Sequence, residues 1–179
     1  MPSLTLLGQS LVSGLFIGGL YGLLGLGLGL SWGLLRLINL AHFALVFLGA
    51  YLTYQLAGTT GMNPFLTVLL IVPAFFVLGV ALQWAFDFFR VNEFASLLVT
   101  FGLTVVIESV IQWVWTADFR RLETPYATLS IRAGPLFLPV TEMVMLLVAT
   151  ALSLLTWAWL RFTWVGKGMR ASVEDPDIA

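Results

Sequence analysis

Two pairs of polar side chains stand inside long apolar runs of this 179-residue sequence. Asn39 and His42 are three residues apart at the start of one run, and Glu108 and Gln112 are four apart inside another. Residues at these spacings share one face of a helix. Amide, imidazole and carboxyl groups all form hydrogen bonds, so each pair is a candidate for lining a translocation pathway or for clamping two helices together.

Each pair also has a structural interpretation. Asn39 could cap the helix that follows it, and a hydrogen bond from His42 could clamp that helix to the glycine-rich helix expected before it. A lone carboxylate at the depth of Glu108 costs a few kcal/mol on membrane-insertion scales, so it should be protonated or bonded inward. Gln112 is one turn away on the same face. Two interpretations of Glu108 therefore stay equally open: a protonated carboxyl with a structural role, and a residue that lines the pathway.

The composition identifies the solvent that these side chains meet. Hydrophobic residues make up 60% of the chain and charged residues 9%, against roughly 25% charged in soluble domains. Such a chain cannot cover its own surface with polar groups, so we predict an integral membrane protein in contact with lipid. The net charge of -1 gives no reason to expect nucleic acid as a partner, and the absence of cysteine excludes disulfides.

The long uncharged runs must be helices, because backbone groups in lipid have no water to bond and about 20 apolar residues cross the hydrocarbon layer. We therefore predict an all-α fold, a polytopic transmembrane helix bundle of about five spans. The transmembrane domain covers residues 1–160, and residues 161–179 form a polar segment. The spans are expected near residues 4–35, 38–56, 64–86, 94–116 and 136–160.

The positive charges set the expected orientation. Five crossings put the two ends of the chain on opposite sides of the membrane. One side then holds Arg36, Arg90, Arg161, Lys167 and Arg170, and the other holds Arg120, Arg121 and Arg132. Because cytoplasmic loops carry the excess of Lys and Arg, we predict an external N-terminus and a cytoplasmic segment 161–179.

The first span carries a stripe of glycines on one helix face. These are Gly14, Gly18, Gly22, Gly25, Gly29 and Gly33, spaced at three or four residues. Small residues allow two helices to approach closely in lipid. We interpret the stripe as a packing surface within the subunit; the alternative is a helix that slides or lines a pathway.

Signatures of enzymes and cofactors are missing from the sequence. The Gly-Lys pair in VGKGM lacks a phosphate loop around it, and the loose G-x-G-x-x-G match in the first span does not follow a strand. One histidine and no cysteine cannot build an ordinary zinc site. We predict no catalytic residue, no metal and no cofactor in this chain, so any energy that drives it would have to come from elsewhere.

Three segments follow, in order, the motifs of one transporter family. The stretch GLYGLLGLGLGLSWGLLRLINLAHFALVFLGAYLTY matches a Gly-rich span, then I-N-x-A-H-G and L-G-A-Y, with Phe43 in place of the last glycine of the second motif. LLVTFGLTVVIES matches A-T-x-G-L-x-x-x-x-Q/E at Thr100, Gly102, Leu103 and Glu108. TWVGKGMRASVEDPDIA matches G-x-x-x-R-A-x-x-x-D-x-x-x-A. Over nearly its whole length the chain resembles the permease subunits of branched-chain amino-acid ABC transporters.

This resemblance implies a permease in the bacterial inner membrane that works with three kinds of partner. A periplasmic substrate-binding protein delivers the substrate, a second permease subunit completes the pathway, and cytoplasmic ABC ATPase subunits drive it. Residues 161–179 would then dock on an ATPase through Gly166, Arg170, Ala171 and Asp175. Family members continue with further spans, so we expect this chain to be an N-terminal part of such a permease.

Other functions stay open beside this one. The chain could belong to a related importer for urea, amides or aromatic acids. It could be a self-sufficient channel or a proton-coupled carrier that uses Glu108. It could also be a structural membrane scaffold, in which substitutions of Glu108 and His42 change stability but never uptake.

Overall fold

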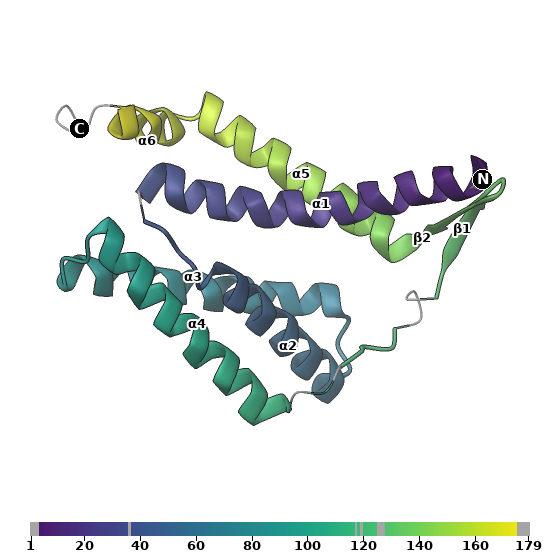
Figure 1. The fold of residues 1–179 in the computed structure, drawn as a ribbon, viewed down its shortest axis with the longest axis horizontal. Helices are drawn as coiled ribbons and strands as arrows, with labels where there is room; N and C mark the ends of the chain where they lie inside the picture. The colour runs from purple at the N-terminus through teal and green to yellow at the C-terminus, as the bar shows by residue number, and fades with distance from the viewer. Residues whose placement is uncertain (1–3, 36, 117, 119, 125–127, 175–179) are drawn as a thin grey trace. The chain divides into compact units, whose positions relative to one another are not determined.

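A computed structural model describes residues 4–35, 37–116, 118, 120–124 and 128–174, and over these ranges it contains six helices and one β-hairpin (Figure 1). In chain order the elements are α1 (Leu4–Leu35), α2 (His42–Thr60), α3 (Pro64–Phe88), α4 (Glu93–Trp115), β1 (Ser130–Ala133), β2 (Leu136–Pro139), α5 (Val140–Phe162) and α6 (Trp164–Glu174). The predicted all-α, polytopic architecture is confirmed. The hairpin and α6 were not predicted as elements.

Four of the helices are long and apolar enough to cross a membrane: α1, α3, α4 and α5. Within the part of the chain that the structure describes, α2 is not among the four, although it has 19 residues. Its second half holds Tyr54, Gln55, Thr59 and Thr60, which lower its mean hydropathy. The expectation of about five spans therefore rests on four strongly apolar helices and one more polar helix.

The chain forms two compact units. One comprises residues 1–34 and 123–179, and the other comprises residues 35–122. The first unit contains α1, the hairpin, α5 and α6. The second contains α2, α3 and α4.

In the second unit, α2 packs on both α3 and α4. Ala41 and Ala44 are almost fully buried and meet Ile107, Ile111 and Trp115 of α4. Small side chains on α2 allow the two backbones to approach, which is how helices associate in lipid. The core of this unit is therefore the α2–α4 contact.

Local signals explain where these helices begin and end. The Asn63 side chain accepts a hydrogen bond from the Phe65 amide at 3.0 Å at the start of α3, where Pro64 takes the first helical position. The Asn92 side chain does the same for the Ala95 amide at 2.8 Å at the start of α4. Gly61 ends α2 with φ of 67°, a conformation that glycine adopts without strain.

In the first unit, α1 lies beside α5 (Figure 1). A Cβ atom added at Gly19 would lie 2.6 Å from Leu146 Cδ1 and 3.6 Å from Leu146 Cα. The helices approach closely at this point because residue 19 has no side chain. The glycine that permits the contact is not a member of the predicted stripe.

The hairpin corrects the predicted start of the fifth span. Residues 136–139 pair with β1 in an antiparallel register that joins Ser130 to Pro139 and Ala133 to Leu136, so α5 begins at Val140 rather than at residue 136. Gly134 forms the turn with φ of 61°. The apolar run of the fifth span is thus shared between a strand and a helix.

A glutamine side chain ties the hairpin to α1. Gln9 Nε2 donates to the Phe137 carbonyl oxygen at 2.9 Å, and Gln9 Oε1 accepts from the Phe137 amide at 2.9 Å. Both backbone groups of Phe137 are therefore satisfied by one side chain.

Candidate functional site

The start of α2 is held by a hydroxyl group of α4. Thr100 is buried, and its Oγ1 accepts a hydrogen bond from the Leu40 amide at 3.1 Å. The same atom is 3.1 Å from the Ile38 carbonyl oxygen and 2.7 Å from that of Ser96 in its own helix. Residues 37–41 are not helical, and non-helical backbone at membrane depth needs such partners.

Asn39 and His42 lie in and next to this segment. The Asn39 backbone oxygen accepts from the His42 amide at 3.4 Å. Asn39 Oδ1 is buried and has no hydrogen-bond partner among the residues that the structure describes. A buried acceptor without a partner costs about 1–3 kcal/mol, so this oxygen would gain from a donor. The proposed capping role of Asn39 is wrong, because the N-cap of α2 is Ala41 and no side chain bonds there.

His42 opens α2 and is half-buried. Its ring meets the Phe43 ring edge-on, with a distance of 5.6 Å between centroids. Phe43 occupies the position where the motif has glycine, so the aromatic side chain covers one side of the imidazole. The predicted clamp from His42 to the glycine-striped helix stays a prediction.

Glu108 and Gln112 lie on a face of α4 that the second unit leaves exposed. The helix turns Ile107, Ile111 and Trp115 into the core instead. No described residue of this unit forms a hydrogen bond or an ion pair with the Glu108 carboxyl. Glu108 is eight residues beyond Thr100, or about 12 Å along the helix. The structure therefore does not bring the two predicted polar pairs into one cluster, and their pathway role stays a prediction.

The glycine stripe of α1 is open within its own unit. At Gly14, Gly18, Gly22, Gly25, Gly29 and Gly33, an added Cβ atom would meet no described atom of that unit within 4 Å. The α1–α5 contact uses Gly19 instead. Packing of the stripe against another helix remains a prediction.

The predicted docking segment begins at a tight corner between α5 and α6. A Cβ atom added at Gly166 would lie 2.5 Å from Leu160 Cα and 2.6 Å from the Trp159 carbonyl oxygen. Thr163 Oγ1 donates to the Trp159 oxygen at 2.7 Å and accepts from the Gly166 amide at 3.0 Å. One threonine therefore ends α5 and caps α6.

The structure describes only some of the other predicted docking residues. Arg170 and Ala171 lie in α6, and Asp175 lies outside the described residues. Gly166 has a clear structural role at the corner, and its contact with an ATPase stays a prediction.

Sequence reasoning missed a polar contact at the other end of the second unit. Trp115 Nε1 donates to Gln55 Oε1 at 3.0 Å, and the Tyr51 ring is 5.4 Å from the Trp115 ring. Arg120 Nη2 donates to the Trp115 carbonyl oxygen at 3.2 Å. Gln55 is an amide inside an apolar run, and the reasoning that singled out Gln112 could have found it.

The second unit also has an apolar hollow of about 220 Å³ among α2, α3 and α4. Its lining is wholly aliphatic and comprises Leu45, Leu48, Leu78, Leu82, Leu103, Val106, Ile107 and Val110. Apolar cavities of this kind stay dry. It offers no partner to a polar solute.

Apolar helices of membrane-crossing length, with polar groups confined to a few contacts, define a polytopic helical membrane protein. A family model described as "Branched-chain amino acid transport system / permease component" matches residues 10–179. The match covers nearly the whole sequence, so the chain belongs to this family of transport permeases, and the resemblance seen in the sequence is confirmed. No curated protein and no solved structure matches the chain.

Proposed function

We propose that the chain is a permease subunit of an ABC importer for branched-chain amino acids in a bacterial inner membrane. The family match over residues 10–179 carries this proposal. The chain would form part of the translocation pathway, with a second permease subunit and a periplasmic substrate-binding protein. It would hold no cofactor of its own, because cytoplasmic ABC ATPase subunits bind and hydrolyse the ATP.

The form of α6 supports a contact with a cytoplasmic partner. This 11-residue helix leaves the apolar α5 at a fixed corner and exposes both apolar and charged side chains. Trp164 is 90% exposed, and Lys167 Nζ lies 5.7 Å from the centre of its ring. An exposed amphipathic helix of this kind can seat on a soluble protein.

Reconstitution tests the proposal directly. Proteoliposomes that contain the chain, its partner permease and the ATPase subunits, supplied with the binding protein, should take up L-leucine only with ATP. The control replaces the ATPase with a variant that binds but does not hydrolyse ATP. Uptake without any ATPase would contradict the proposal. ATP-dependent uptake of urea, an amide or an aromatic acid, without uptake of L-leucine, would instead identify the chain as part of one of the related importers.

A second candidate is a self-sufficient channel or proton-coupled carrier. The observation in its favour is the exposed Glu108 carboxyl on α4, because intramembrane carboxyl groups often carry protons. This candidate predicts flux through the isolated chain in liposomes and its loss in Glu108→Gln. The importer predicts no such flux in either protein.

A further inference from the structure

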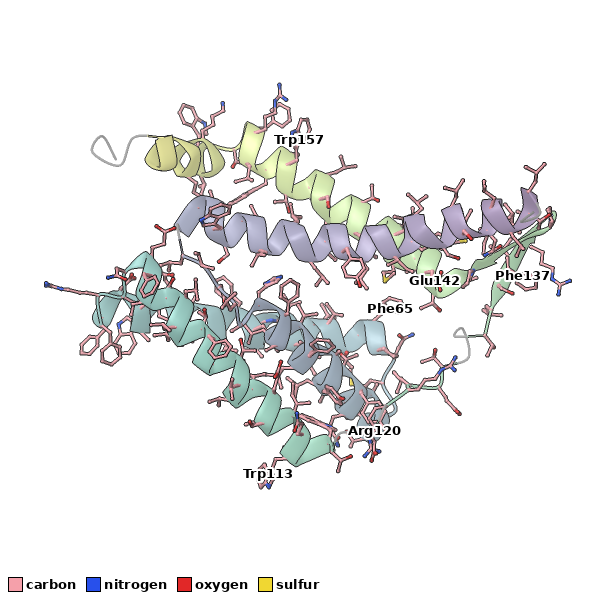
Figure 2. All side chains as sticks on the ribbon, in the orientation of Figure 1. Phe65, Trp113, Arg120, Phe137, Glu142 and Trp157 are labelled. Atoms are coloured by element: carbon pink, nitrogen blue, oxygen red, sulfur yellow. The ribbon has the colours of Figure 1, made fainter. Side chains whose placement is uncertain are left out.

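A second hollow of the same unit, of about 240 Å³, combines aromatic side chains with a positive charge. Phe47, Ala50, Tyr51 and Tyr54 line it from one face of α2. Arg120, labelled in Figure 2, completes it from the segment after α4. The volume is below the roughly 300–1,000 Å³ of sites for drug-sized ligands. It suits a small ligand or one part of a larger molecule.

Arg120 is held in place by the end of α4. All three of its described polar contacts use Nη2: the Trp115 carbonyl oxygen at 3.2 Å, Thr116 Oγ1 at 3.4 Å and Asp118 Oδ2 at 4.0 Å. A guanidinium has five N–H donors in a planar fork. Those on Nη1 and Nε are not used by any described residue. The side chain is 39% exposed and lines the hollow, so a ligand there can reach it.

The aromatic wall is also fixed. The Tyr51 ring packs on Trp115, and the indole of Trp115 is bonded to Gln55. A preorganised wall loses little conformational entropy when a ligand binds. Phe47 and Ala50 supply apolar surface, and the two tyrosines each add a hydroxyl that can donate a hydrogen bond.

We propose that this hollow binds an amphipathic oxyanion, whose negative group pairs with Arg120 and whose aliphatic body lies against Phe47 and Ala50. Arginine recognises carboxylate and phosphate groups through paired N–H donors. Two sources offer this chemistry: a free aliphatic amino acid and the headgroup of an anionic phospholipid. The lipid source goes beyond the proposed function, whereas the amino-acid source rests on it; neither needs the ATPase subunits for binding.

The test compares the full chain in nanodiscs with three variants. Arg120→Gln removes the charge, and Ala50→Leu fills the hollow while leaving Arg120 intact. Arg121→Gln is the matched control, because it removes a neighbouring exposed charge that does not line the hollow. The probes are L-leucine, leucinamide, which lacks the carboxylate, and phosphatidylglycerol in phosphatidylcholine discs. Circular dichroism compares the helix content of all four proteins.

Each result decides the proposal. L-leucine binding that falls about tenfold or more in Arg120→Gln and Ala50→Leu, but not in Arg121→Gln, supports an amino-acid ligand, and leucinamide should then bind poorly. Phosphatidylglycerol retained by the wild type and Arg121→Gln, but lost from the other two in native mass spectrometry, supports a lipid ligand. If Arg120→Gln loses helix content, Ala50→Leu decides alone. Unchanged binding of L-leucine and of phosphatidylglycerol in Ala50→Leu, or binding of neither to the wild type, overturns the proposal.

Discussion

The Thr100 hydroxyl oxygen lies 3.1 Å from the Leu40 backbone nitrogen, although the two residues are 60 positions apart. Through this contact and the neighbouring Ile38 carbonyl, one side chain of α4 fixes the segment that precedes α2. Asn39 and His42, the candidate pathway residues, are positioned by it.

Replacement of Thr100 by valine should destabilise the protein. Valine keeps the shape of the side chain but leaves the part-buried Leu40 amide without its acceptor, and the loss of such a hydrogen bond costs about 0.5–1.5 kcal/mol. Unfolding of the purified protein by sodium dodecyl sulfate, followed by circular dichroism, measures the effect. Thr104→Val is the matched control, because among the described residues the Thr104 hydroxyl bonds only the Thr100 carbonyl of its own helix. Equal stability of the two variants would contradict the role assigned to Thr100.

Trp115→Phe should lower stability by about 0.5–1.5 kcal/mol, since it removes the hydrogen bond to Gln55 but keeps an aromatic ring beside Tyr51. The same detergent titration measures it. Trp113→Phe, at a position that is 85% exposed, should leave the unfolding midpoint unchanged. A larger effect at position 113 than at 115 would argue against the α2–α4 core.

Substitutions along α1 should distinguish the role of Gly19 in the α1–α5 contact from the role of the glycine stripe. Gly19→Leu places a side chain where Leu146 already lies, so overpacking should cost about 1–3 kcal/mol. At Gly22 an added Cβ atom would meet no described atom within 4 Å beyond the helix's own backbone, so Gly22→Leu should spare the stability of the isolated chain. If the stripe packs on a second permease, Gly22→Leu should nevertheless reduce co-purification of that partner. A stability loss at position 22 equal to that at 19 would rule out this division of roles.

Gly166→Ala should displace α6, because the new Cβ atom would clash with backbone atoms of α5, which cannot rotate away. Under the proposed function, association with the ATPase subunits should fall several-fold, measured by co-purification. Gly168→Ala is the control: no described atom lies within 4 Å of its added Cβ, and alanine favours the helix by up to about 1 kcal/mol. If Gly166→Ala still binds the ATPase subunits normally, the corner between α5 and α6 is not needed for docking.

Much of the fold was predictable because apolar length alone defines membrane helices. The predicted bounds of the first span match α1, and those of α3 and α4 differ from the prediction by two residues or fewer. The start of α2 was missed because a hydroxyl 60 residues away holds residues 37–41 out of the helix. The start of α5 was missed because β1 supplies hydrogen bonds to residues 136–139. Such long-range partners leave no periodic pattern in the segment that they alter.

The candidate site was predictable only as a set of residue types. Spacing placed Glu108 and Gln112 on one face of a helix, and the structure agrees, but spacing could not tell that this face lies outside the α2–α4 core. Gly166 illustrates the same limit. Its place in a motif suggested a surface contact, whereas in the structure it lies against backbone atoms of the preceding helix.

The bond from Gln9 to Phe137 has a consequence for assembly. In an antiparallel pair, alternate residues point both backbone groups away from their partner strand and toward the next one. Phe137 is such a residue, and Gln9 fills both positions with its amide, as a neighbouring strand would. The Gln9 side chain thus blocks this edge of the hairpin from pairing with a strand of another molecule. A chain without Gln9 would expose the Phe137 backbone groups as a site for such pairing and for aggregation.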